Sequence, residues 1–229
     1  KTIRFNTARL MVAATLPSSS GISDESQALW KKFHVLAVAC RNAPDGTLAI
    51  VALVDTDRAM PGSEKARLAS LLLFRADDGE VLAETATNFR CFARLRWKDT
   101  LADGYADSMK LLGDSVFLLH RHDREGRTVI VEHTIHFRPR PSFAQGRDFT
   151  YDAMRLHARP PHWLFAIHDR LITVDQSNAV VFWEATTAKP LKTVVLSMGR
   201  DYIIGAWLTA DGLVVLQSDG TGAEVLTIS

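Results

Sequence analysis

Residues 162–196 read HWLFAIHDRLITVDQSNAVVFWEATTAKPLKTVVL, and this stretch decides the fold class. It contains four apolar runs, at 163–167, 171–174, 179–183 and 191–196, which are separated by polar turn residues. Runs this short, rich in Val, Ile, Leu, Phe and Thr, are typical of strands rather than helices. The turns are too short for a crossover, so successive strands must be antiparallel. The stretch therefore predicts a four-stranded antiparallel sheet.

The same pattern of strand, turn and strand recurs along the chain. Four segments superpose on one another, and they begin at Leu71, Val116, Val180 and Val214. The starts lie 45, 64 and 34 residues apart, which fits a repeat of roughly 40 residues with one long insertion. Antiparallel four-stranded units repeated at this period are the anatomy of β-propeller blades. The sequence thus predicts an all-β fold with propeller-like blades, of which four or five fit into 229 residues.

The pair Trp183-Glu184 closes the third run of the best segment, and here the sequence resembles a WD40 repeat. That family carries a Trp-Asp pair at this point. Ser177 occupies the position of the family's structural Asp, with Asp175 two residues earlier, and no Gly-His pair opens a blade. The resemblance covers residues 35–229 and implies degenerate WD40-like blades. It also implies that Trp183 packs between neighbouring blades with its indole N–H on a buried acceptor.

The other three segments depart from the Trp-Asp signature. Their matching pairs are Phe74-Arg75, Leu119-His120 and Gln217-Ser218. The turn Asp78-Gly79 also resembles quinoprotein-type propeller blades. Five glycines at polar turns should mark tight connections because glycine accepts a positive φ; they are Gly46, Gly79, Gly126, Gly212 and Gly220.

Outside the strand pattern, the sequence predicts an N-terminal extension over residues 1–34 and a propeller-like domain over residues 35–229. Residues 23–33 open with Ser and an early carboxylate, which predicts a short helix in the extension. Insertions are expected near residues 100–112, as a short helix, and 138–160, where residues 142–157 form either a loop or a helix. Residues 56–65 are expected to be a surface loop.

The amino-acid composition limits the classes of partner and indicates the cellular compartment. Lys plus Arg number 27 against 26 for Asp plus Glu, so there is no long-range attraction to nucleic acid or to an acidic membrane surface. Apolar runs such as 68–74 are far shorter than the roughly 20 residues of a membrane helix. Cys40 and Cys91 are interpreted as buried thiols in a reducing compartment. The expected location is therefore intracellular, cytoplasmic or nuclear.

The sequence lacks the common local motifs of catalytic and cofactor sites. The sequence has no Gly-x-Ser-x-Gly, no Gly-x-Gly-x-x-Gly and no Cys-x-x-Cys. His120 and His122 alternate on one predicted strand, whereas His133 and His136 fall on opposite faces of another. A metal needs three convergent ligands, so the histidines are interpreted as polar strand residues. We therefore expect no catalytic residue, no cofactor and no metal.

Two basic clusters are the candidate partner-binding residues. Arg94 and Arg96 alternate on one strand face beside Trp97, and Arg138 and Arg140 flank a proline. Arginine next to an aromatic residue is typical of an anchor for an acidic protein or for nucleic acid. The alternative is a solvated strand face that nearby acidic residues balance.

These observations favour a non-catalytic scaffold or adaptor subunit that binds other proteins within a larger assembly, without membrane association. One alternative is a nucleic-acid-associated subunit, as in RNA processing or the ribosome. A second is a propeller-fold enzyme, either a quinoprotein-like oxidoreductase or a hydrolase. Metal analysis separates the enzyme from the scaffold, and the salt dependence of binding separates the nucleic-acid case.

Overall fold

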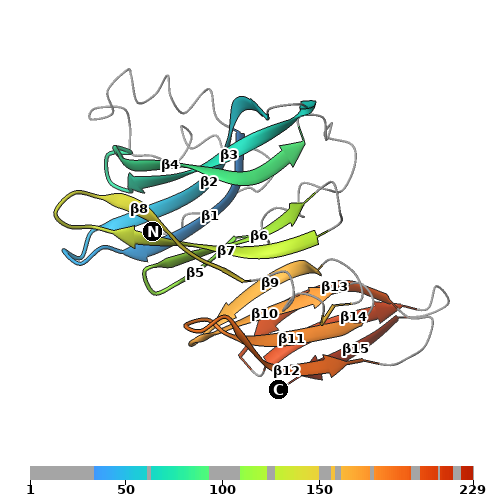
Figure 1. Cartoon of the computed structure of the whole chain (residues 1–229). Helices are drawn as coiled ribbons and strands as arrows, with labels where there is room; N and C mark the ends of the chain where they lie inside the picture. The colour runs from blue at the N-terminus through green and yellow to red at the C-terminus, as the bar shows by residue number, and fades with distance from the viewer. Residues whose placement is uncertain are drawn as a thin grey trace. The chain divides into compact units, whose positions relative to one another are not determined.

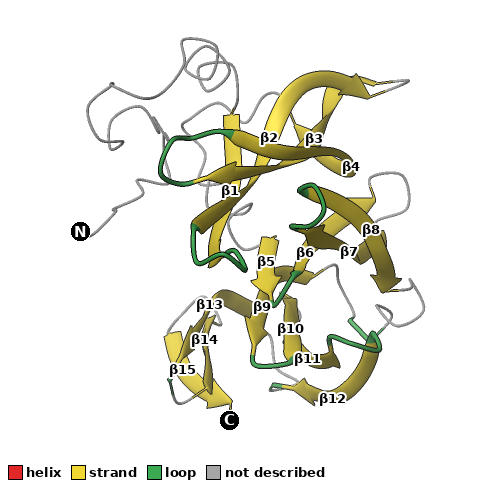
Figure 2. Ribbon diagram, turned by 90° about the vertical axis from the view of Figure 1, so that its left-hand side faces the viewer, coloured by secondary structure: helices red, strands yellow, loops and turns green. Residues whose placement is uncertain are grey.

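The computed structural model describes residues 34–60, 63–92, 109–122, 127–149, 156–157, 161–175, 178–196, 202–210, 212–218 and 223–228. Every regular element in these ranges is a β-strand (Figures 1 and 2). The all-β prediction is therefore confirmed. The predicted helix over residues 23–33 lies outside the described residues.

The strands form four antiparallel sheets, each ordered as the chain runs. The first contains β1 (His34–Asn42), β2 (Leu48–Met60), β3 (Ser63–Arg75) and β4 (Val81–Phe92). The second contains β5 (Met109–Leu112), β6 (Ser115–His122), β7 (Arg127–His136) and β8 (Ser142–Phe149). The third contains β9 (Pro161–Ile167), β10 (Arg170–Asp175), β11 (Ala179–Glu184) and β12 (Lys189–Val195). The fourth contains β13 (Tyr202–Thr209), β14 (Gly212–Ser218) and β15 (Ala223–Ile228).

Such up-and-down sheets, each connected by short hairpins, are blades of the β-propeller type. Contacts divide the chain into two compact units. The first comprises Lys1–Val116 and His133–Gln145, and the second comprises Phe117–Glu132 and Gly146–Ser229.

In the first unit, the middle strands of the first sheet are buried on both faces. Leu71, Leu72 and Leu73 follow one another on β3 and all have an exposed fraction of 0%. Continuous apolar runs predict this burial, because a strand with one solvated face would alternate apolar and polar residues. One face of this sheet forms a cluster of Ala52, Val54, Leu72 and Phe74.

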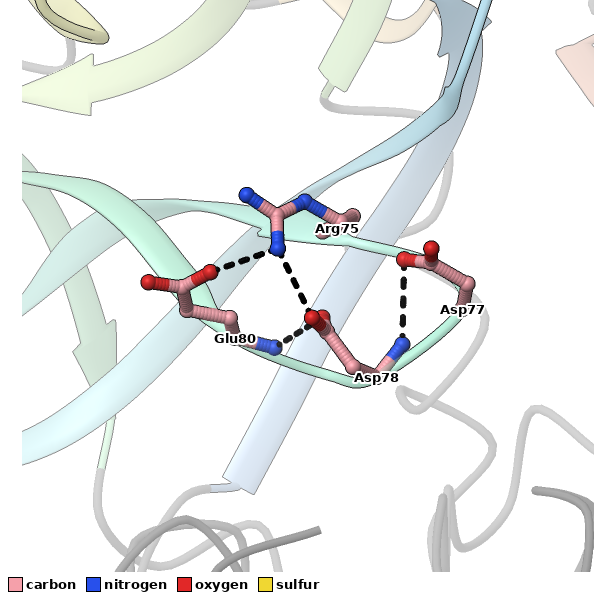
Figure 3. A network of polar contacts seen from close by, with 4 residues as sticks. All are labelled: Arg75, Asp77, Asp78 and Glu80. Atoms are coloured by element: carbon pink, nitrogen blue, oxygen red, sulfur yellow. Dashed lines mark hydrogen bonds and ion pairs between the residues drawn. The ribbon is translucent and has the colours of Figure 1, made fainter. Parts of the chain in front are cut away.

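The β3–β4 hairpin is closed by polar contacts around one arginine (Figure 3). Arg75 Nη1 lies 2.7 Å from Asp78 Oδ2 and 2.7 Å from Glu80 Oε2. The Glu80 amide donates to Asp78 Oδ1 at 2.9 Å, and the Asp78 amide donates to Asp77 Oδ1 at 3.1 Å. Gly79 has a φ of 74°, as a tight turn requires. The turn prediction is confirmed here, and also at Gly46 and Gly212, whose φ angles are 84° and 138°.

In the second unit, the third and fourth sheets pack through a shared core. Its buried members are Phe165, Ile172, Val174, Val180, Ile203, Leu213 and Val215. The four strands predicted from residues 162–196 are all present as β9 to β12.

The superposition of the four repeats was out of phase. The segments beginning at Leu71 and Val180 are the third and fourth strands of their sheets, whereas those beginning at Val116 and Val214 are second and third strands. Every antiparallel hairpin has the same alternating pattern, so the pattern alone does not say which hairpin of a blade it is. Phe74 is therefore the true counterpart of Trp183, since both precede the last residue of a third strand.

Four local predictions were wrong. Residues 142–149 form strand β8 rather than a loop or helix, and residues 109–112 form strand β5 rather than a helix. Residues 56–60 and 63–65 extend β2 and β3, so the expected loop is a continuation of a long hairpin. Cys40 was predicted as a buried thiol but is exposed on β1, an edge strand of its sheet, and the side chain of Cys91 is not described.

Candidate functional site

A buried chain of polar side chains organises the third sheet. His157 Nδ1 lies 3.1 Å from Asp175 Oδ2, and His157 Nε2 lies 2.7 Å from Thr173 Oγ1. The indole Nε1–H of Trp183 donates to the same Thr173 oxygen at 2.7 Å. Asp175 Oδ1 also accepts the backbone N–H of Ala179 at 3.1 Å, across the β10–β11 turn.

The two ends of this chain have opposite hydrogen-bonding roles. An indole only donates and an ionised carboxylate only accepts, so hydrogen bonds can be donated in one direction from Trp183 to Asp175. With a neutral His157 protonated at Nδ1, the Thr173 hydroxyl donates to Nε2 and Nδ1–H donates to Asp175. Each of these polar groups then has a partner, which a buried network requires.

The network is buried throughout. Thr173, Asp175 and Trp183 have an exposed fraction of 0%, and His157 has 8%. An Asp-His-Thr order resembles a nucleophilic triad in its connectivity, but a nucleophile must reach its substrate. The Thr173 hydroxyl is enclosed and already accepts the Trp183 N–H, so these contacts hold the blade together.

Trp183 meets the expectation placed on it. Its N–H has a buried acceptor, and its ring contacts Phe149 of β8 edge to face, with centroids 6.0 Å apart. Phe149 in turn contacts Phe117 of β6 at 6.0 Å. Trp183 thus joins the third sheet to strands of the second.

The rest of this network has little signal in the sequence. Asp175 binds across the turn, whereas Ser177, which occupies the family's Asp position, lies outside the described residues. His157 precedes β9 and is 16 residues from Thr173, so no local spacing connects them. Thr173 and Asp175 do alternate with apolar residues, and two polar residues in an apolar strand were the available signal.

The second candidate site is the loop of residues 137–141, in the first unit. Arg138 and Arg140 are both exposed, as a partner-binding role requires. The start of the loop is anchored: the Arg41 guanidinium lies 5.2 Å from the centroid of the Phe137 ring. Arg41 is itself held by an ion pair with Asp114 and by the carbonyl of Gly113, 2.5 Å away.

The other predicted residues are not brought to either site. Arg94, Arg96 and Trp97 lie outside the described residues. His133 is buried, with an exposed fraction of 6%, and His136 is exposed, as their opposite strand faces require. The side chains of His120 and His122 are not described.

Metal ligands and membrane-spanning helices can be assessed in the described part of the chain. Within it, no group of three or more His, Cys, Asp or Glu side chains is arranged to hold a metal ion. The same residues contain no helix of the length and hydrophobicity needed to cross a membrane.

Fold and site together define an all-β chain of propeller-type blades, one of which is built around a buried His-Asp-Thr-Trp network. No protein-family model matches the sequence, and no curated protein matches it.

Three solved structures are similar in fold. BamB from Moraxella catarrhalis is 14% identical, with a TM-score of 0.44 over 83% of this chain and 48% of BamB. The computationally designed Ika4 protein is 8% identical, with a TM-score of 0.44 over 94% of this chain and 96% of Ika4. A europium-containing methanol dehydrogenase is 12% identical, with a TM-score of 0.35 over 48% of this chain and 20% of the dehydrogenase. The chain thus spans about half the length of BamB and about a fifth of the length of the dehydrogenase.

Proposed function

We propose that this chain is a non-catalytic protein-interaction module of WD40-like propeller blades, which acts as a scaffold or adaptor within an intracellular assembly. The blade built on Trp183 supports the WD40-like assignment, because Asp175 bridges its turn and Trp183 closes its third strand. An exposed thiol at Cys40 suits a reducing compartment.

The observation that carries the binding role is the arginine loop, defined as residues 137–141. Two exposed guanidiniums stand beside Pro139 and Pro141, whose fixed φ angles reduce the entropy lost on binding. Within the described residues neither Arg138 nor Arg140 has an ion-pair partner. Guanidinium groups bind carboxylates through two parallel hydrogen bonds, so an acidic segment of a partner protein suits this loop.

Affinity purification from the native source tests this proposal. Wild type should retain a protein partner, and the double variant Arg138→Glu/Arg140→Glu should lose it. The matched control is Arg147→Glu/Lys189→Glu, which reverses two exposed charges outside the arginine loop and should retain the partner. All three proteins should melt alike, because surface substitutions change stability by about 0.5 kcal/mol or less.

Nuclease treatment distinguishes the classes of partner. Retention that resists nuclease supports a protein partner, whereas loss with nuclease assigns the loop to nucleic acid instead. Equal retention by both double variants would show that the arginine loop is not the anchor.

A further inference from the structure

An open pocket of about 260 Å³ lies in the second unit, where the hairpin ends of the third and fourth sheets meet. Its apolar wall comes from six strands, β9, β10, β11, β13, β14 and β15. The wall consists of Ile167, Ile172, Phe182, Leu208, Leu213 and Ile228. The polar rim is the β9–β10 turn, with His168, Asp169 and Arg170.

The pocket is the point where the core between these sheets reaches solvent. Ile172 and Leu213 belong to the buried core, with exposed fractions of 2% and 1%. Ile167, Phe182 and Ile228 pack against that core but are only partly buried. An apolar group entering here would extend the core and remove apolar surface from water.

The size of the pocket indicates what kind of ligand it can hold. Pockets for small molecules and cofactors usually enclose about 300–1,000 Å³. This pocket is smaller and open on one side. It therefore suits one bulky side chain of a peptide better than a metabolite.

Arg170 supplies a charged group beside the apolar wall. Its side chain is 57% exposed, and its Nε lies 3.8 Å from Asp169 Oδ1. Within the described part of the chain its two terminal nitrogens make no hydrogen bond, so they can take a carboxylate in a bidentate pair. The Lys192 ammonium, 5.8 Å from the Phe182 ring centroid, adds a second cation.

Two carboxylates are also near this rim, and each is engaged. Asp169 is the ion-pair partner of Arg170 Nε, and Glu184, which pairs with Arg170 in the β10–β11 register, accepts the Thr187 hydroxyl. The terminal nitrogens of Arg170, on a side chain that is 57% exposed, are therefore available to a ligand.

We infer that this pocket binds an acidic–apolar peptide segment of a partner protein. A leucine or phenylalanine side chain of the segment enters the pocket, and a neighbouring carboxylate binds Arg170. The pocket shares no residue with the arginine loop, so the inference goes beyond the proposed function and stands or falls separately.

Methyl NMR of the full chain tests the inference directly, because five wall residues carry methyl groups. The probe is a capped peptide of alternating aspartate and leucine. Its addition should shift the methyl signals of Ile167, Leu208 and Ile228, while those of Leu191 and Val195 on exposed β12 should stay in place. A matched peptide with serine for leucine should shift none of them.

Arg170→Glu should lower the affinity for the peptide by about tenfold or more, because a bidentate charged pair is replaced by repulsion between two carboxylates. Lys189→Glu is the control and should change the affinity little. The double variant Arg138→Glu/Arg140→Glu should bind the peptide normally, which separates this test from that of the arginine loop. The inference is overturned if the wall methyls do not shift, if β12 shifts equally, or if Arg170→Glu binds as tightly as wild type.

Discussion

Thr173 occupies the centre of the buried network, because its one oxygen serves both Trp183 and His157. A valine has nearly the same shape but neither donates nor accepts. The contribution of this hydroxyl can therefore be isolated from the packing of the side chain.

Thr173→Val should lower the free energy of unfolding by about 1–3 kcal/mol, because it leaves the Trp183 N–H buried and unpaired. Thr193→Val on exposed β12 is the matched control and should change stability by about 0.5 kcal/mol or less. Urea denaturation measures both. Equal effects of the two substitutions would mean that the network adds no stability.

Trp183→Ala should destabilise the protein by about 3–5 kcal/mol, since it opens a cavity beside Phe149 and removes the N–H donor of Thr173. Trp207→Ala is the control, because 43% of that side chain is exposed on edge strand β13. In thermal melts, Trp183→Ala should lower the melting temperature much more than Trp207→Ala does. A reversed order would contradict the assignment of Trp183 as the core of its blade.

At the scale of the element, the hairpins are the units that local sequence defines. In the β3–β4 hairpin the turn residues bond one another, so its geometry does not depend on distant contacts. Local definition has a limit, however. Trp183 and Phe74 occupy equivalent positions on the third strands of their sheets. The side chain of Phe74 has no N–H, so it needs no buried acceptor. The two blades therefore share the same kind of hairpin but differ in the polar groups that are buried beside it.

The β3–β4 hairpin should show a measurable pH dependence through Asp78. Partial burial acts to raise the pKa of Asp78, but hydrogen bonds from the Glu80 amide and the Arg75 guanidinium outweigh it, and the pKa lies below its usual value. The folded state thus favours the ionised carboxylate. Its stabilising contribution is complete above the unfolded pKa of about 4 and is lost as the pH falls through the folded pKa.

Asp78→Asn should therefore melt below wild type at neutral pH, and the two melting temperatures should converge in strong acid. The difference should be small because 38% of the side chain is exposed. A difference that stays constant from neutral to acid pH would contradict this account of Asp78.

At the scale of the whole molecule, the described residues form four blade sheets, and their regular structure is strand alone. Far-ultraviolet circular dichroism of the full chain should show mainly strand, with helix as a minor share. A helix content above about 35%, the average of globular proteins, would contradict the all-β fold.

By itself the sequence determined the all-β class and the position of most hairpins, although strands β5 and β8 were not predicted. Apolar alternation and Asp-Gly turns are local properties, so the hairpins at residues 71–86 and 180–195 were predicted correctly. Tertiary structure alone decided the phase of the repeats, the burial of His157 against Thr173 and Asp175, the exposure of Cys40 and the pocket beside Arg170. Those features depend on which strands become neighbours and which edges meet solvent, and period-2 alternation is the same for every pairing.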